Sequence, residues 1–214
     1  MKKDKLFFTA DLHFGHHNIL CYDSRPFLTI EEHDEVLIQN WNSVAPHDSK
    51  VFVLGDLFWS RNPDVNLGIL KRLNGRIILV KGNHEKWLKK LTPQQISLKI
   101  DKVVDYLEIK VQDPEADNGR SQHIVMCHYA FLTWNRALRG SWNLFGHSHG
   151  NLPISIGKSL DVGINSHSYY PISYSQVRDI MSKRDKIALG YNISALLKAY
   201  SKGELEKATR KEDE

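Results

Sequence analysis

The sequence is short of cysteine and has no long apolar run. Its two cysteines, Cys21 and Cys127, are too few for a disulfide framework among 214 residues, and they indicate a reducing compartment. We therefore expect a cytoplasmic protein. No stretch of about 18 apolar residues is present, so we expect no membrane-spanning helix. The apolar residues 6–8 near the start are too few for a signal peptide.

Charge of neither sign dominates, and the chain also lacks internal repeats and low-complexity linkers. The 29 Lys and Arg residues against 25 Asp and Glu residues give a formal net charge of +4. This mild excess is compatible with an anionic substrate but does not by itself indicate one. A mean hydropathy of −0.42 is typical of a globular chain. We expect a single α/β domain over residues 1–200 and a solvated, charged tail over residues 201–214.

Histidine, by contrast, is plentiful, and its placement carries most of the information. Apolar runs that end in polar residues predict strands at residues 6–10, 50–55, 76–80, 123–127 and 141–145. The polar residues that follow these strands are Asp11, His13, Asp56, Asn83, His84, His128, His147 and His149. One sheet could bring such strand ends to a single edge, where open α/β sheets bind their ligands.

The remaining elements follow from capping residues, helical spacing and alternation. Thr29 and Glu32 match a capping box, and apolar residues at helical spacing extend the predicted helix over residues 30–44. Helices are also expected at residues 64–73, 86–91 and 173–183, and a helix-prone segment begins at Asn192. The alternating residues 102–111 predict one strand, and residues 154–162 predict a strand or hairpin.

The strand-end residues suit metal ligation, and seven of the eight could serve as ligands. Carboxylate, amide and imidazole groups bind divalent cations such as Mn²⁺, Fe²⁺ or Zn²⁺, whereas the lack of a thiolate cluster argues against a structural zinc site. Each piece alone has an ordinary explanation. Asp11-Leu12-His13 alone is more often a turn, and His128 alone is more often a hydrogen-bonded core histidine. Their joint occurrence at strand ends is what indicates a two-metal site.

The order of these residues resembles that of the calcineurin-like metallophosphoesterases, and residues 11–19 together with Arg25-Pro26-Phe27 resemble a small bacterial and phage-type subgroup. The family pattern D-x-H, G-D, G-N-H-[DE], H and G-H-x-H is matched by Asp11-Leu12-His13, Gly55-Asp56, Gly82-Asn83-His84-Glu85, His128 and Gly146-His147-Ser148-His149. The resemblance spans residues 11–149. It implies an α/β fold, a four-layer α/β/β/α sandwich, with a two-metal site at the carboxyl ends of the strands.

The resemblance also implies a role for each residue. The first metal ion would be bound by Asp11, His13, Asp56 and His149, and the second by Asp56, Asn83, His128 and His147. Manganese is the expected metal, with iron, zinc, nickel or cobalt as alternatives. Two cations about 3.5–4 Å apart would clamp the attacking and leaving oxygens of an in-line displacement and activate a shared water. His84 would contact the phosphate or protonate the leaving oxygen as a general acid.

One departure from the family pattern bears on the substrate. Protein-phosphatase relatives carry G-D-x-x-D-R, whereas here Gly55-Asp56 is followed by Leu57-Phe58-Trp59-Ser60-Arg61. The second Asp is absent and the Arg comes one position late. We therefore expect a phosphoesterase that acts on phosphodiesters of a nucleotide or nucleic-acid kind rather than on phosphoproteins. The candidate substrate contacts are His16, His17 and Arg61.

Two other functions stay open on the sequence alone. A nuclease would bind DNA or RNA with an affinity that weakens with salt, and Phe58 and Trp59 next to Asp56 keep this alternative open. The basic residues between positions 71 and 90 could steer a polyanion. A non-catalytic metal-binding scaffold would keep the fold, but such proteins usually lose ligands, and none is missing here. The pattern indicates a phosphate-ester substrate and no membrane partner, and it leaves the oligomeric state open.

Overall fold

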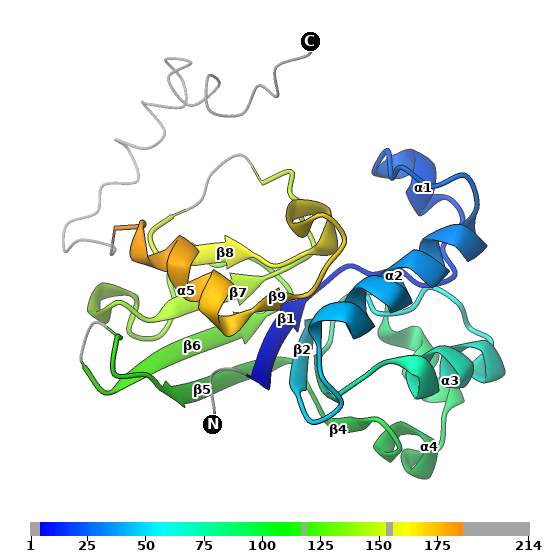
Figure 1. Ribbon diagram of the computed structural model, residues 1–214, viewed down its shortest axis with the longest axis horizontal. Helices are drawn as coiled ribbons and strands as arrows, with labels where there is room; N and C mark the ends of the chain where they lie inside the picture. Colours follow the sequence, from blue (N-terminus) through cyan, green and yellow to red (C-terminus); the bar gives the residue numbers. More distant parts are fainter. Residues whose placement is uncertain (1–4, 117–118, 153–155, 186–214) are drawn as a thin grey trace.

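The computed structural model describes residues 5–116, 119–152 and 156–185, which form two β-sheets and the helices around them (Figure 1). The first sheet has the strand order β4-β3-β2-β1-β9, and the second has the order β5-β6-β7-β8. The strands are β1 (Leu6–Thr9), β2 (Lys50–Leu54), β3 (Arg76–Val80), β4 (Ile100–Val104), β5 (Tyr106–Gln112), β6 (Ser121–Cys127), β7 (Trp142–Phe145), β8 (Ser159–Asp161) and β9 (Ile172–Ser173). The α-helices are α1 (Ile19–Tyr22), α2 (Ile30–Val44), α3 (Pro63–Arg72), α4 (Pro93–Ser97) and α5 (Tyr174–Ser182), and the 3₁₀ helices are η2 (Glu85–Lys90), η3 (Ala137–Arg139) and η4 (Ile164–His167).

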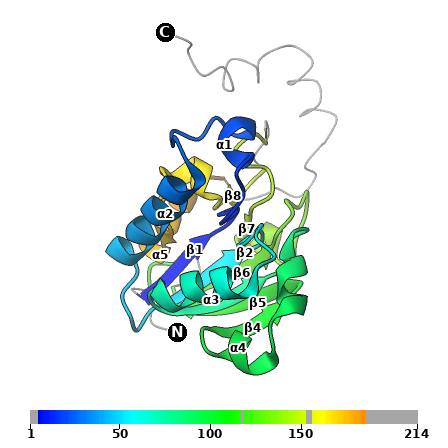
Figure 2. The ribbon, with the colours of Figure 1, turned by 90° about the vertical axis from the view of Figure 1, so that its right-hand side faces the viewer.

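Most strands run parallel to their neighbours, which gathers their carboxyl ends. Strands β1 to β4 pair in parallel, and so do β6, β7 and β8, whereas β9 and β5 are antiparallel edge strands. In Figure 2, β1 runs from the N-terminal side of the molecule toward α1. The loops that leave β1 and β2 therefore emerge at the α1 end of the molecule.

Side chains of the first sheet alternate between two hydrophobic cores, as a sheet buried on both faces requires. In β2, Val51 and Val53 face the core that also contains Trp41 of α2. Their neighbours Phe52 and Leu54 face the core shared with the second sheet. Figure 1 shows the same order, with α2 and α3 on one side of the first sheet and strands β5 to β8 on the other.

The outer face of the second sheet is covered by the segment that follows β6. Phe131, Trp134 and Ala137 pack against Val125 of β6, and Ala137 begins the short helix η3. Together with the helices on the first sheet, this arrangement confirms the two-sheet α/β sandwich that the resemblance implies. The strand ends of the site, however, come from two sheets and not from one.

The single strand expected at residues 102–111 is wrong, because two strands of different sheets occupy this region. Strand β4 ends at Val104, and β5 begins at Tyr106. Asp105 lies at the crossing between the sheets, where its carboxylate pairs with Lys81 at 2.8 Å. The alternation of apolar residues continues on both sides of the crossing, so the pattern contained no sign of the break.

The helix predicted at residues 30–44 is confirmed as α2, but its cap differs in one bond. The Thr29 hydroxyl accepts from the Glu32 N–H at 3.1 Å, as expected. The Glu32 carboxylate accepts from the Leu28 N–H at 2.8 Å and not from the N–H of Thr29. The helices expected at residues 64–73 and 173–183 correspond to α3 and α5, and the helical stretch at 86–91 is the 3₁₀ helix η2.

Parts of two expectations lie outside the described residues. These are residues 154–155 of the expected strand or hairpin and everything from Asn192 onward, including the tail at 201–214. Within the described part of the former segment, Ser159–Asp161 form β8. None of the helices in the described ranges is long and apolar enough to span a bilayer.

Candidate active site

The site begins where the loops after β1 and β2 run side by side. The hydrogen bonding of the parallel strands continues past their ends. The N–H of Asp11 donates to the Gly55 carbonyl at 3.1 Å, and the N–H of His13 donates to the Asp56 carbonyl at 2.9 Å. The two loops therefore hold the first polar residues after both strands in a fixed register.

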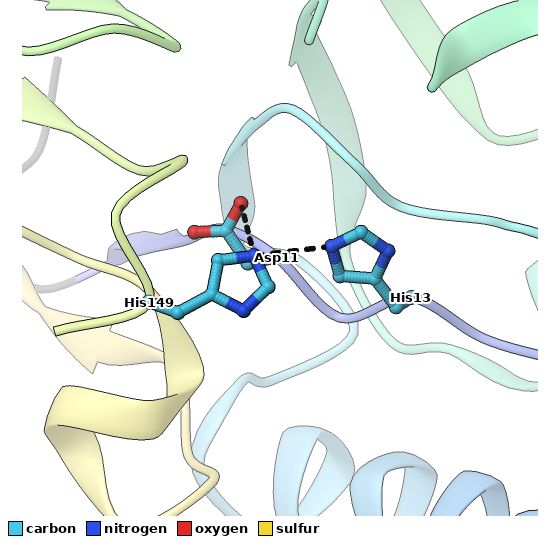
Figure 3. A group of neighbouring side chains, drawn as sticks. All are labelled: Asp11, His13 and His149. Carbon is cyan, nitrogen blue, oxygen red and sulfur yellow. Dashed lines mark hydrogen bonds and ion pairs between the residues drawn. The ribbon is translucent and has the colours of Figure 1, made fainter. Parts of the chain in front are cut away.

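Asp11, His13 and His149 form the first cluster of potential metal ligands, and His149 comes from the loop after β7 (Figure 3). Nε2 of His149 lies 3.3 Å from Nε2 of His13 and 3.8 Å from Oδ1 of Asp11. Nδ1 of His149 lies 2.5 Å from the Asp23 carboxylate and donates to it, so the ring is oriented with Nε2 toward the cluster. Donor atoms bound at about 2.1 Å to one ion lie roughly 3 to 3.4 Å apart. The two imidazole nitrogens already have this spacing.

Asp56, His128 and His147 form the second cluster, which draws on the loops after β2, β6 and β7. Nδ1 of His128 donates to the Leu54 carbonyl at 2.7 Å, which leaves Nε2 of the neutral ring as an acceptor. This Nε2 lies 3.0 Å from Oδ1 of Asn83, which is also an acceptor, and 3.5 Å from Oδ2 of Asp56. Acceptors that face one another repel unless a cation lies among them, so this arrangement suits a metal ion.

Asp56 joins the two clusters. Its Oδ2 lies 3.6 Å from Nε2 of His13 and 3.5 Å from Nε2 of His128. A carboxylate in this position can contact two cations at once. Asp11 adds a second link, because its carboxylate accepts from the His147 N–H at 2.9 Å.

His84 lies beside the clusters without belonging to either. Its N–H donates to Oδ1 of Asp56 at 3.0 Å, while Nε2 lies 3.9 Å from Oδ2 of the same residue. The next residue, Glu85, is buried, and its carboxylate accepts from the N–H groups of Gly82 (2.6 Å) and Leu57 (3.2 Å). Glu85 thereby ties the loop after β3, which carries His84, to the loop after β2. Burial, followed by the charge of Asp56, raises the pKa of Glu85 to about 7.

Five of the seven predicted ligands have backbones in the left-handed region. Their φ angles are +59° at Asp11, +54° at His13, +54° at Asp56, +68° at His147 and +49° at His149. Residues other than glycine rarely adopt this conformation, which costs on the order of 1–3 kcal/mol per residue. Such strain persists where the surrounding structure holds it in place. Its concentration at these strand ends marks them as a functional site.

Two glycines of the motifs make room for His128. A Cβ atom at Gly55, where φ is +94°, would lie 2.2 Å from Nδ1 of His128. A Cβ at Gly82 would lie 2.4 Å from Oδ1 of Asp56 and 2.9 Å from Nε2 of His128. The glycines before Asp56 and Asn83 are therefore needed for the side chains to approach one another.

The charges of the clusters fit a bound cation. Burial, and then the nearby carboxylates of Asp161 and Asp56, raise the pKa of Asp11 well above its usual value. Burial also lowers the pKa values of His13 and His128, so both rings are neutral near pH 7. Carboxylates that repel one another beside neutral imidazoles are a donor set that a divalent cation stabilises.

A model of the calcineurin-like phosphoesterase family matches residues 5–189. The chain belongs to this family. Calcineurin-like phosphoesterases are metal-dependent hydrolases of phosphoester bonds, and they typically bind two divalent metal ions. The chain is therefore a metal-dependent phosphoester hydrolase, and its two clusters are the candidate sites for the ions.

Relatives of this phosphoesterase occur in an archaeal strain and in phages. An uncharacterised protein of Methanocaldococcus jannaschii is 30% identical over 190 residues, which are 86% of this chain and 94% of the relative. The gene 66 protein of Mycobacterium phage D29 is 24% identical over 83% of this chain and 96% of its own length. The phage L5 gene 66 protein is 37% identical over 36% of this chain and 38% of its own.

A solved structure supports the fold of the phosphoesterase. The crystal structure of a protein of unknown function from Aquifex aeolicus is similar with a TM-score of 0.58 and 20% sequence identity. The similarity covers 82% of this chain and 98% of the other. At this identity the likeness bears on the fold alone.

The pocket of the phosphoesterase has a volume of about 500 Å³, and both clusters open into it. Of the three predicted substrate contacts, His16 lines this pocket and stacks on Trp59 with ring centroids 3.9 Å apart. His17 is exposed and is not part of the lining. Arg61 lines a smaller, adjoining pocket together with Lys86. The structure thus brings His16 to the site, places Arg61 next to it and leaves His17 outside.

Sequence reasoning missed the structural role of two residues that hold the first cluster. Arg25 is 4% exposed, and its guanidinium donates to the carbonyls of Leu12 (3.0 Å) and Asp11 (2.8 Å) and to the Asp23 carboxylate (3.0 Å). Asp23 in turn accepts from Nδ1 of His149. Charged residues in a loop are usually exposed, and nothing in a single sequence marked this pair as buried.

Proposed function

We propose that this phosphoesterase is a two-metal phosphodiesterase. One ion would be held by Asp11, His13, Asp56 and His149, and the other by Asp56, Asn83, His128 and His147. The proposal is supported by the converging lone pairs of the histidines and by the position of Asp56 between the clusters. When bound, the two ions would supply the positive charge that activates water and neutralises the phosphate. Manganese is the metal we propose, and the same oxygen and nitrogen ligands also suit iron, zinc, nickel or cobalt.

His84 is proposed as the general acid or phosphate contact. Its main-chain N–H is held by Asp56, and its ring lines the pocket. About one third of the side chain is exposed, so Nε2 can reach a bound substrate. From this position the ring can hydrogen-bond a phosphate oxygen and deliver a proton to the leaving oxygen. Glu85 contributes indirectly, because it fixes the loop that carries His84.

The charge of the pocket is the observation that favours phosphodiesters. No Lys or Arg is among the described residues that line the main pocket. Trp59 occupies the position of the second Asp in the protein-phosphatase pattern, and its ring lies 4.7 Å from that of His84. A phosphate monoester carries about −1.5 to −2 charges at pH 7, whereas a diester carries one. A pocket without fixed cations besides the metals matches the diester better.

A comparison of a diester with a monoester tests this proposal. Metal-free protein is supplied with Mn²⁺, Fe²⁺, Zn²⁺, Ni²⁺ or Co²⁺ in turn, and hydrolysis of bis-p-nitrophenyl phosphate is measured beside that of p-nitrophenyl phosphate. We expect Mn²⁺ to give the highest kcat/KM and the diester to be preferred. A preference for the monoester with every metal contradicts the diesterase proposal. Protein that binds metal but hydrolyses neither compound indicates the scaffold function instead.

A further inference from the structure

A second, smaller pocket adjoins the proposed reaction site. It has a volume of about 130 Å³ and is lined by Trp59, Arg61, His84, Lys86 and Trp87. Trp59 and His84 also line the main pocket, so the two spaces meet at these side chains. The two linings differ in charge. The described lining of the small pocket has two cations and no carboxylate, while that of the main pocket has no Lys or Arg.

The two cations of the small pocket are available to a ligand. Arg61 and Lys86 are exposed, and neither forms an ion pair within the part of the chain that the structure describes. Arg72, in the same basic stretch of sequence, is instead paired with Glu35 at 2.7 Å. A volume of 130 Å³ corresponds to about four water molecules. This space admits a compact anion such as a phosphate group, but not a nucleobase as well.

The wall between the two pockets is aromatic. Trp59 is 43% exposed although one face of its indole is covered by His16 in a nearly parallel stack, with 9° between the planes. Tyr22, which is 73% exposed, also lines the main pocket near His16. Exposed aromatic rings beside a phosphate site are the usual platform for stacking the bases of single-stranded nucleic acid.

Building on the phosphodiesterase function above, we propose that Trp59, Arg61 and Lys86 form a subsite for the nucleotide next to the scissile bond. The base of this nucleotide stacks on Trp59, and its other phosphate enters the small pocket beside the two cations. The enzyme's substrates are then short single-stranded oligonucleotides, or dinucleotides that carry an additional phosphate. An isolated small diester fills the reaction site but not the subsite.

Dinucleotide substrates test the subsite by kinetics. The probes are thymidylyl-thymidine and its two derivatives with an additional phosphate at the 5′ or the 3′ end, beside bis-p-nitrophenyl phosphate. We expect one phosphorylated derivative to have a kcat/KM about tenfold above that of the unphosphorylated dinucleotide. In Arg61→Gln/Lys86→Gln this ratio falls to about one, mainly through KM, whereas the matched variant Lys89→Gln/Lys90→Gln keeps it. A wild-type ratio near one for both derivatives, or equal ratios in the two double variants, overturns the subsite.

A binding measurement separates failure of the subsite from failure of the proposed function. The phosphorylated dinucleotides are titrated into chelator-treated protein, and tryptophan fluorescence is recorded. We expect quenching that is lost in Trp59→Leu and weakened at least several-fold in the Arg61/Lys86 double variant. Quenching without hydrolysis of any diester supports the proposed subsite and contradicts the proposed phosphodiesterase function. Hydrolysis of the small diester, without quenching and without a preference for the phosphorylated dinucleotides, supports the phosphodiesterase function and contradicts the proposed subsite.

Discussion

The two ligand clusters differ in how the rest of the molecule supports them. The first is backed by a buried ion pair, in which Arg25 holds the main chain of Asp11 and the carboxylate of Asp23, and Asp23 orients His149. The second is held mainly by backbone groups, such as the Leu54 carbonyl that fixes His128. Its member His147 and the neighbouring Asn83 are exposed and line the pocket.

Because of this contrast, we expect the two clusters to differ in metal affinity. Partners that orient the ligands typically raise metal affinity by a factor of about 10–100. We therefore expect the first cluster to hold its ion more tightly, and the second to exchange its ion more readily. Members of both clusters line the substrate pocket, and the ring of His84 lies 5.6 Å from that of His13 in the first cluster. The first site would then stay occupied at low metal concentration, whereas occupancy of the second would depend on the supply of metal and substrate.

The largest expected effect comes from Asp56→Asn, because Asp56 belongs to both clusters. The substitution preserves the shape of the side chain but removes its charge. We expect diesterase kcat/KM to fall on the order of 10⁴-fold, which corresponds to several kcal/mol of lost charge stabilisation. Elemental analysis of the purified variant should find less than one ion per chain at metal concentrations that saturate the wild type. Full occupancy with two ions would show that Asp56 does not join the sites.

His84→Ala should leave both clusters occupied and still impair turnover. The ring touches neither cluster as a ligand, so metal content should stay at the wild-type value. Loss of a general acid lowers kcat by about 10³-fold. His47→Ala, which changes an exposed histidine in the turn before β2, serves as the matched control. Loss of one ion in His84→Ala would instead show that His84 is a metal ligand and would contradict its assignment as a substrate contact.

Asp23→Asn addresses the difference between the clusters directly. The amide cannot replace the carboxylate that accepts from both His149 and Arg25. We expect affinity for the first ion to fall about 10–100-fold, as measured by competition with a chromogenic chelator. Asp64→Asn, at an exposed position in the first turn of α3, is the control for the loss of one charge. Lower affinity for the second ion with unchanged affinity for the first would contradict the assignment of Asp23 to the first cluster.

The smallest expected effect is on thermal stability. Bound ions stabilise only the folded chain, by about 2.7 kcal/mol for each site at a ligand concentration of 100 times Kd. For a domain of this size, one such site raises the Tm by roughly 5–10 °C. Differential scanning calorimetry with Mn²⁺ and with chelator measures the shift, which should be smaller in Asp23→Asn at equal Mn²⁺. Identical Tm values with and without metal would argue against ion binding in the folded state.

Local patterns in the sequence predicted most elements of the fold. The helix at 30–44 and the strand at 76–80 agree with α2 and β3 in both bounds. The cap at Thr29 and the helical spacing define the helix, and an uninterrupted apolar run defines the strand. The strand expected at 102–111 failed for a physical reason. Its alternating pattern fits two consecutive strands that belong to different sheets. Only the tertiary arrangement places the crossing between them at Asp105.

The candidate site was predictable wherever a residue follows an apolar strand directly. Asp56 and His128 are of this kind, and both lie in a cluster. Asp23 and Arg25 were not predictable, because their role depends on a contact with His149, which is more than 120 residues away in sequence. Asp161 is similar. The sequence does not link it to Asp11, yet its charge raises the pKa of Asp11.

Titration of metal-free protein with Mn²⁺, with bound metal and bis-p-nitrophenyl phosphate hydrolysis followed in the same samples, tests the two-metal function most directly. We predict that two ions bind per chain in two steps of unequal affinity. Hydrolysis should remain low through the first equivalent and rise with the second, because the proposed reaction needs the charge of both ions. Saturation at one ion per chain, or full activity after the first equivalent, would contradict a two-metal phosphodiesterase.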